Sequence, residues 1–254
     1  MYLKQRIAAA QCLIGAGVYS YSPEAVEYSA PGMDWLWWES QHSLGDWQTT
    51  AHGVRAAHII QVPLLIRTWT HQGETIERLL DTGAEGIIAP TVNRPDQAAE
   101  IVSHCYYPPV GKRSWGTARI ERQGLGTDEW NRRIVVILMI ETAEGLQNAE
   151  AIAAVPGVDG LLIGPADLAL NLGKPNAPFV GHDAIRVEAD LVLAACRNTG
   201  KAAGAIAVTA PELKARIQEG FRFLSAGMDV YHAAVAFRHL RNAGRQFTAE
   251  LGLL

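Results

Sequence analysis

Short apolar runs alternate along the chain with longer stretches whose apolar residues recur at helical spacing. The runs are rich in β-branched and aromatic residues, and several are apolar at nearly every position, as expected for strands buried on both faces. Eight segments show this pattern: 13–19, 34–39, 62–68, 86–91, 135–142, 160–165, 202–208 and 222–227. The pattern therefore predicts eight strands that are separated by helices.

Amphipathic segments with helical spacing lie between several of the predicted strands. They cover residues 73–82, 95–104, 184–199 and 211–220. The last two run up to Gly200 and Gly220, and a glycine at this place is suited to end a helix. Asp183 and Thr209 are placed to cap the N-termini of the same two helices.

The repeat of strand and helix sets the fold class. Eight units in 254 residues give about 32 residues for each, which is the size of one βα unit. We therefore predict an α/β fold, a (β/α)8 TIM barrel formed by residues 1–254 as a single domain. A doubly wound open sheet is the alternative. Its glycine-rich turn begins at Gly15 and Gly17, but the rest of that pattern is missing.

Composition narrows the class of protein. The chain has 48% hydrophobic and 19% charged residues, a net charge of −4 and a pI of about 6.1, all typical of a globular protein. This charge gives no reason to expect nucleic-acid binding. No apolar run approaches the roughly 18 residues of a membrane span. Gln11 interrupts the apolar stretch 7–18, which favours a buried first strand over a signal peptide.

The cysteines suggest a reducing environment. Cys12, Cys105 and Cys196 are odd in number and lie outside any CxxC spacing, so neither a disulfide framework nor a thiolate zinc site is expected. We expect three reduced thiols in a cytoplasmic protein.

The longest segment without clear periodicity covers residues 106–133. It contains the consecutive prolines Pro108 and Pro109, and Trp115. Loops of this length in compact domains usually serve as lids or binding loops, so we expect this segment to have a functional role.

In a barrel, active-site residues gather where the strands end. The second predicted strand ends at Glu39 and is closely followed by His42, and the third ends near Arg67. Glu141 lies near the end of the fifth strand, and Asp167 closely follows the sixth. Because strands five and six should be neighbours, we expect the Glu141 and Asp167 carboxylates to meet at one rim.

Two converging carboxylates repel each other unless a positive charge lies between them. A hard divalent cation with oxygen ligands fits Glu141 and Asp167. A general acid/base pair as in glycosidases is an alternative, and either residue could instead cap a helix or lie in a turn. His42 is a candidate functional residue because it directly follows a strand. Arg67 needs an anion, which could be a substrate carboxylate or oxyanion, or a structural carboxylate.

Several motifs in the same order resemble the HpcH/HpaI aldolase family, whose members are metal-dependent class II pyruvate aldolases. The resemblance covers nearly the whole chain, and members include 4-hydroxy-2-oxoheptanedioate and 2-dehydro-3-deoxyglucarate aldolases. The motifs are DWL at 34–36 with QH at 41–42, YPPVGKR at 107–113, MIET at 139–142 and VPGVDGLLIGPADL at 155–168. The family fold is a (β/α)8 barrel, in agreement with the strand pattern.

The resemblance implies a role for each of five polar residues. Glu141 and Asp167 match the metal ligands of the family. His42 matches the catalytic base, and Arg67 matches the residue that stabilises the enolate oxygen. Asp81 matches the carboxylate that raises the basicity of the histidine. At the end of a predicted helix, a negative charge such as that of Asp81 is mildly unfavourable, which is consistent with a functional reason for it.

The substrate pocket departs from the family pattern. The backbone around Ala166, next to Pro165, matches a contact to the pyruvate carboxylate. Met139 stands where the family usually has Gln, so a hydrogen-bonding group is lost. Gln41 stands where the family has Glu, and one of two negative charges before the histidine is therefore missing. Ser114 replaces a common Gly. We therefore expect the family's reaction with an altered pocket.

The implied reaction is the reversible aldol cleavage of a 4-hydroxy-2-oxo acid to pyruvate and an aldehyde, with Mg2+, Mn2+ or Co2+ stabilising a pyruvate enolate. No lysine lies in the predicted strands, which disfavours a Schiff-base mechanism. A citrate-lyase-β-like acyl-CoA lyase and a non-catalytic barrel that binds a 2-oxo acid are the alternatives. The resemblance also implies a homo-oligomer, a hexamer or trimer of dimers that exchanges its last helix. No nucleic-acid or membrane partner is expected.

Overall fold

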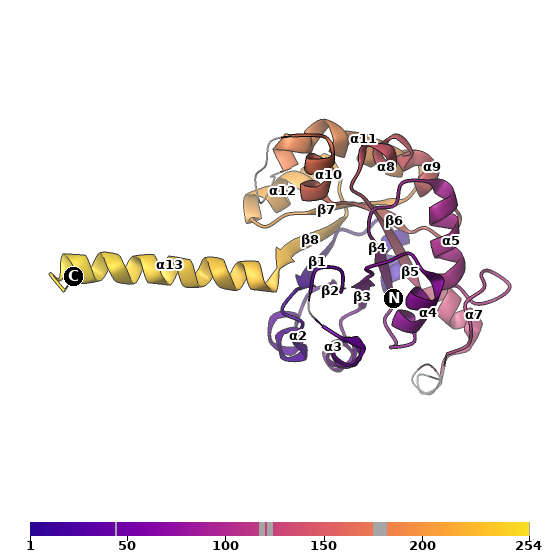
Figure 1. Ribbon diagram of the computed structural model, residues 1–254, viewed down its shortest axis with the longest axis horizontal. Coiled ribbons are helices and arrows are strands. Elements are labelled where there is room, and N and C mark those ends of the chain that lie inside the picture. The colour runs from indigo at the N-terminus through magenta and orange to yellow at the C-terminus, as the bar shows by residue number, and fades with distance from the viewer. Residues whose placement is uncertain (44, 117–119, 121–123, 175–181, 254) are drawn as a thin grey trace.

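Eight parallel strands close into a barrel and follow one another around it in sequence order (Figure 1). The computed structural model describes residues 1–43, 45–116, 120, 124–174 and 182–253. The strands are β1 (Leu13–Val18), β2 (Trp35–Glu39), β3 (Leu64–Arg67), β4 (Gly86–Ala89), β5 (Val135–Ile140), β6 (Gly160–Ile163), β7 (Ala202–Ile206) and β8 (Phe223–Met228). Each lies within one or two residues of its predicted range, and the predicted TIM barrel is confirmed.

Helices alternate with the strands, and those between β1 and β8 cover the outside of the barrel (Figure 1). They are α1 (Leu3–Ala8), α2 (Pro23–Ser29), α3 (Trp47–Ile59), α4 (Gly73–Leu80), α5 (Pro95–Cys105), α7 (Thr127–Arg133), α8 (Ala143–Gln147), α9 (Ala149–Ala153), α10 (Pro165–Asn171), the 3-10 helix η1 (His182–Ile185), α11 (Arg186–Thr199), α12 (Ala210–Glu219) and α13 (Asp229–Glu250).

Three of the four predicted helix-end residues lie where the sequence indicates. The Thr209 side chain accepts a hydrogen bond from the backbone N–H of Glu212 in a capping box. Gly200 and Gly220 end α11 and α12 with φ angles of 68° and 114°. The prediction for Asp183 was wrong, because the 3-10 helix precedes α11 and makes Ile185 its N-cap residue.

Two tryptophans of β2 fill the barrel interior. Trp35 and Trp37 are two residues apart on β2, so both side chains point into the barrel, and both are completely buried. Trp35 stacks on Phe223, with 3.9 Å between the ring centroids. Opposite them on β1 lie Gly15 and Gly17. A Cβ atom at these glycines would lie 2.4 Å and 2.2 Å from the indole rings, so the two glycines make room for the indoles.

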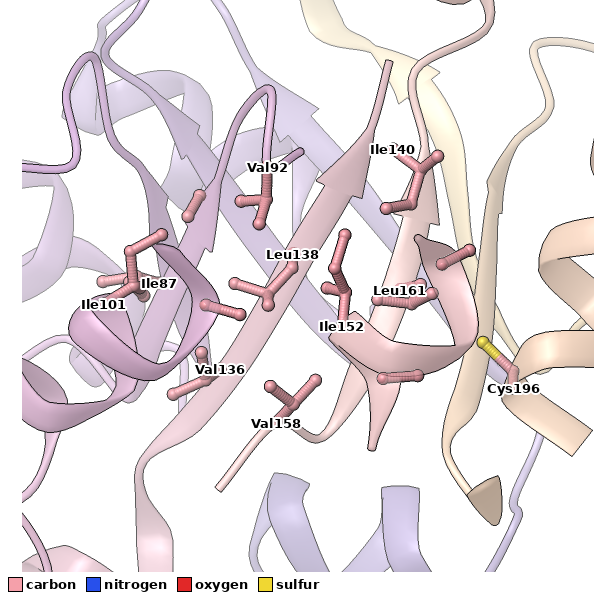
Figure 2. Packing of buried hydrophobic residues seen from close by; sticks show 14 of the residues in the cluster. Ile87, Val92, Ile101, Val136, Leu138, Ile140, Ile152, Val158, Leu161 and Cys196 are labelled. Carbon is pink, nitrogen blue, oxygen red and sulfur yellow. The ribbon is translucent and has the colours of Figure 1, made fainter. Parts of the chain in front are cut away.

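The outward faces of the strands pack against the helices in a second, larger core. Figure 2 shows Ile87, Val136, Leu138 and Leu161 pointing away from the barrel axis, toward side chains of the surrounding helices such as Ile152. Because both strand faces are buried, these strands are apolar at nearly every position, which is the pattern from which the fold was predicted.

Helix α1 closes the end of the barrel at which the strands begin. Leu3 and Ile7 pack in the same cluster as the interior residues of the strands. Lys4 forms an ion pair with Asp159, with 2.7 Å between Nζ and Oδ1. This end of the interior is therefore filled by apolar contacts, and the polar residues gather at the opposite rim.

The last helix, α13, extends away from the barrel (Figure 1). It is 22 residues long and none of its residues is buried. The sequence pattern alone did not predict it. No described helix, α13 included, is both long enough and apolar enough to cross a membrane.

The segment 106–133 is anchored at both ends. Tyr106 and Tyr107 are buried after α5, and Trp130 of α7 is buried before β5. Its middle part, residues 117–119 and 121–123, lies outside the described residues. The predicted lid falls partly on those residues and stays a prediction.

Candidate active site

Charged residues form the top layer of the barrel interior. Side chains alternate along a strand, so Glu39 points inward two residues after Trp37, and Arg67 points inward two residues after Leu65. Glu141 lies two residues after Met139 in the same way. All three charged side chains are buried, with exposed fractions of 0%, 4% and 2%. Buried charges at this rim require partners or a function.

Arg67 lies between two carboxylates. Its Nη1 donates to Oε2 of Glu39 and its Nη2 donates to Oε1 of Glu141, both at 3.2 Å. The register of β2 and β3 places Glu39 directly beside Arg67. Burial by itself would lower the pKa of Arg67, but the two carboxylates outweigh it and raise that pKa. Arg67 therefore stays charged in this buried position.

The second oxygen of Glu141 is also fixed. Oε2 accepts hydrogen bonds from the backbone N–H and the hydroxyl of Thr91, at 2.7 Å and 2.9 Å. A Cβ atom at Gly164 would lie 2.3 Å from Oε1 of Glu141, so this approach requires a glycine. Burial raises the pKa of Glu141, Arg67 opposes this rise, and the nearby charge of Asp167 adds to it.

Asp167 lies in the first turn of α10, directly after β6, and its side chain is exposed. It shares a pocket of about 330 Å3 with residues from the ends of four strands. The lining residues are Gln41, His42, Thr91, Glu141, Thr142, Asp167, Leu170 and Asn171. The structure thus brings Glu141, Asp167 and His42 together at one rim.

The polar groups of this pocket suit a hard cation. Glu141 and Asp167 supply two carboxylates, and no group of three or more His, Cys, Asp or Glu residues in the described part of the chain is arranged to hold a metal ion. Oε1 of Gln41 is buried and has no hydrogen-bond partner among the described residues. Mg2+ is typically held by one or two carboxylates together with water and substrate oxygens. The residues present therefore fit a divalent cation.

Comparison with known proteins identifies the family. A family model described as HpcH/HpaI aldolase/citrate lyase matches residues 21–236. The chain belongs to this family. A hydroxypyruvate/pyruvate aldolase from Cupriavidus necator is 32% identical over 96% of this chain and 92% of that protein. The match covers most of both proteins.

Two further comparisons agree with the HpcH/HpaI assignment. A 2-keto-3-deoxy-L-rhamnonate aldolase from Klebsiella pneumoniae is 32% identical over 89% of this chain and 86% of that protein. The crystal structure of an HpcH/HpaI family protein from Burkholderia cenocepacia superposes with a TM-score of 0.88 at 30% identity, covering 96% of this chain and 98% of that one. The chain is therefore an enzyme, a lyase of the aldolase type.

One position at which the HpcH/HpaI pattern differs and two positions that match it lie close to the site. Met139 is 1% exposed and packs in the interior cluster with Trp37, below the charged layer. The side chain of Met139 therefore offers the charged layer no hydrogen bond, unlike the Gln that the family usually has at this position. Pro165 and Ala166 begin α10 directly before Asp167, so their backbone lies at the same rim.

Asp81 does not meet His42 within one chain. Asp81 is the C-cap residue of α4, shortly before β4 begins, whereas His42 follows the end of β2. In a barrel of parallel strands these places lie at opposite rims, about 15 Å apart. Asp81 instead accepts a hydrogen bond from Nη2 of the buried Arg113 at 2.7 Å. One chain alone therefore does not bring Asp81 to His42, and the role that the resemblance implies for Asp81 stays a prediction.

The sequence pattern assigns no role to three residues in or next to the charged layer. Glu39 lies at a predicted strand end, but the pattern does not predict its bond to Arg67. Thr91 closely follows β4 and binds Glu141. Tyr19 directly follows β1 and lies near Glu39 and Arg67. The inward alternation from Trp35 through Trp37 to Glu39 is the signal that could have identified Glu39 as an interior carboxylate.

Proposed function

We propose that the enzyme catalyses the divalent-metal-dependent, reversible aldol cleavage of a 4-hydroxy-2-oxo acid to pyruvate and an aldehyde. The observation that carries this proposal is the hydrogen bond from Arg67 to Glu141, a residue that lines one pocket together with Asp167 and His42. This arrangement places a fixed positive charge next to one of the two carboxylates suited to a cation. Both features favour an enolate.

Glu141 and Asp167 would hold the cation, which could be Mg2+, Mn2+ or Co2+. The bound cation supplies Lewis-acid polarisation of the keto carbonyl, which lowers the free energy of the enolate. Thr91 keeps the Glu141 carboxylate oriented through two hydrogen bonds. Gln41 offers a further neutral oxygen at the pocket wall.

Arg67 would stabilise the negative charge that develops on the enolate oxygen. Its guanidinium is held by two carboxylates before substrate binds, so little reorganisation is needed during the reaction. Backbone N–H groups of the first turn of α10, such as that of Ala166 after Pro165, would contact the substrate carboxylate, since the first N–H groups of a helix have no partner inside it.

His42 would act as the base. It is exposed at the pocket rim, where a side chain can reach the substrate. In the cleavage direction it takes the proton from the C4 hydroxyl as the bond between C3 and C4 breaks, and it returns the proton in the aldol direction. The same site therefore serves both directions.

The names of the relatives suggest which enolate donors to try. The Cupriavidus necator protein is named for hydroxypyruvate and pyruvate, and the Klebsiella pneumoniae protein for a deoxy sugar acid. We include hydroxypyruvate as well as pyruvate in the proposal, with an aldehyde derived from a sugar acid as the second product. The apolar Met139 near the pocket floor would alter the preference among them.

The proposal is tested by the exchange of the pyruvate methyl protons for deuterium. This exchange needs the enolate but no aldehyde, so it tests the site before the natural substrate is known. We expect exchange with Mg2+ and none after EDTA has removed the metal.

We also propose that the enzyme is a homo-oligomer, such as a hexamer, in which α13 of one copy packs on a second copy. Phe237 and Leu240 of α13 are 72% and 67% exposed. A mostly apolar groove of about 610 Å3 lies at the foot of α13, lined by residues of α2 and α12 such as Ala25 and Leu213. Exposed apolar surfaces of this kind mark interaction sites.

The double substitution Phe237→Glu with Leu240→Glu should therefore dissociate the assembly. Two buried apolar side chains contribute about 2 kcal/mol each, so association should weaken by roughly 100-fold or more. Light scattering coupled to size-exclusion chromatography gives the mass. Arg186→Glu, a charge reversal on the exposed face of α11, is the control. An unchanged mass in the double variant would contradict the proposed contact.

A further inference from the structure

The carboxylate of Glu39 has no role in the reaction as proposed. It is nevertheless completely buried at the charged layer of the barrel. A buried carboxylate is costly unless donors surround it, and a Gln at this position would fill almost the same space without the charge. The contacts of Glu39 therefore indicate what its charge does.

Donors from the ends of two neighbouring strands converge on this carboxylate. Oε1 accepts hydrogen bonds from the backbone N–H groups of Gln41 and His42, at 2.7 Å and 3.0 Å. Oε2 accepts the bond from Nη1 of Arg67 at 3.2 Å. Both oxygens of this acceptor-only group are therefore engaged by donors.

These contacts fix the direction of Arg67. The turn after β2 holds Oε1, so Oε2 is directed at one edge of the planar guanidinium. The other edge of Arg67 then faces Glu141, and the Trp37 ring lies 5.6 Å from the guanidinium carbon. Burial, followed by the charge of Glu39, raises the pKa of Tyr19, so the Tyr19 hydroxyl keeps its proton and adds no negative charge next to Glu39 and Arg67.

Arg67 has only two carboxylate partners among the described residues, and the two are not equivalent. Glu141 is a proposed metal ligand, and a cation there competes with Arg67 for the charge of that carboxylate. Glu39 is not among the residues that line the pocket and is not a proposed metal ligand. Its hold on Arg67 is therefore independent of whether Glu141 binds a cation.

We propose that Glu39 is a positioning residue that orients the Arg67 guanidinium toward the enolate oxygen through a hydrogen bond between Oε2 and Nη1. This inference rests on the proposed function. It assigns Glu39 no contact with the substrate and no proton transfer. Its effect passes through Arg67, so it should affect the binding of an enolate-like anion much more than the binding of the metal.

The test compares Glu39→Gln with the wild type in two titrations followed by calorimetry. The first measures the affinity and stoichiometry of Mn2+ alone. The second adds oxalate, a planar dianion that resembles the pyruvate enolate, to the Mn2+-loaded protein. In Glu39→Gln we expect oxalate affinity to fall by about 10- to 100-fold, because a misplaced catalytic group loses interactions of this size. Mn2+ affinity should change by less than about threefold.

Stoichiometry separates positioning from simple unfolding. Mn2+ counts the intact sites, so a partly unfolded variant would show fewer sites with unchanged oxalate affinity, and that result would overturn the inference. Glu39→Asp keeps the charge but draws the carboxylate back by one methylene, and we expect an intermediate oxalate affinity. Should Glu39→Gln fail to fold, wild-type oxalate affinity in Glu39→Asp would overturn the inference.

Glu85→Gln is the matched control, since it removes a half-buried carboxylate at the opposite rim, next to the start of β4. We expect wild-type affinity for oxalate in this control. Wild-type oxalate affinity in Glu39→Gln would overturn the positioning role alone. If the wild type itself bound neither Mn2+ nor oxalate, the proposed function would fail, and this inference with it.

Discussion

Replacing Asp167 with Asn should lower Mn2+ affinity by about 100-fold or more and reduce turnover at equal metal concentration by a similar or larger factor. Asp167 is one of two carboxylates among the described residues that line the pocket, so the variant leaves Glu141 as the one charged ligand of this set for a divalent cation. Calorimetric titration with Mn2+ measures the first effect, and exchange of the pyruvate methyl protons measures the second.

The fold should not change in this variant. Asp167 is exposed and lies on the first turn of α10, so its replacement should change the free energy of unfolding by no more than about 0.5 kcal/mol. Asp190→Asn is the control, because it removes an exposed carboxylate from α11, none of whose residues lines the pocket. Full metal-dependent turnover in Asp167→Asn would contradict the proposal that Glu141 and Asp167 together hold the cation.

Replacing Arg67 with Ala should slow enolate formation by about 100- to 1000-fold, the usual effect of losing one preorganised oxyanion donor. The kcat for exchange should fall much more than the affinity for Mn2+. The change also leaves Glu39 and Glu141 buried without their cation, so the free energy of unfolding should fall by about 3 to 5 kcal/mol. Denaturant unfolding measures the second effect.

Arg67→Lys is the matched variant. It keeps a positive charge but cannot donate to both carboxylates with the planar fork of a guanidinium. We expect the free energy of unfolding to fall less in Arg67→Lys than in Arg67→Ala. The kcat of Arg67→Lys should still be far below that of the wild type. If Arg67→Ala changed only the affinity for metal, Arg67 would be a structural residue and the enolate would need another source of stabilisation.

The sequence predicted the barrel well because its strands are buried on both faces. All six residues of β5 are buried. An apolar run of this length, rich in β-branched residues, predicts a buried strand. The strand ends also located Glu141, Asp167, His42 and Arg67, since parallel strands in a barrel all end at the same rim. For these features, local pattern and topology are sufficient.

Other features depend on packing between distant segments. The resemblance suggested that Asp81 acts on His42, but the direction in which α4 runs places Asp81 at the opposite rim. The bond between Glu39 and Arg67 depends on the register of two neighbouring strands, which composition and periodicity do not give. The alternation of strands and helices likewise does not predict that α13 extends away from the barrel (Figure 1).

The central claim is that the pocket forms a metal-dependent enolate of a 2-oxo acid. It is tested most directly by proton NMR of pyruvate, and in parallel of hydroxypyruvate, in D2O with the wild-type enzyme and Mg2+. The account predicts that the carbon-bound protons next to the keto group exchange for deuterium, that EDTA stops the exchange, and that added Mg2+ restores it. Exchange that continues unchanged in EDTA, or no exchange with any divalent metal, would contradict the account.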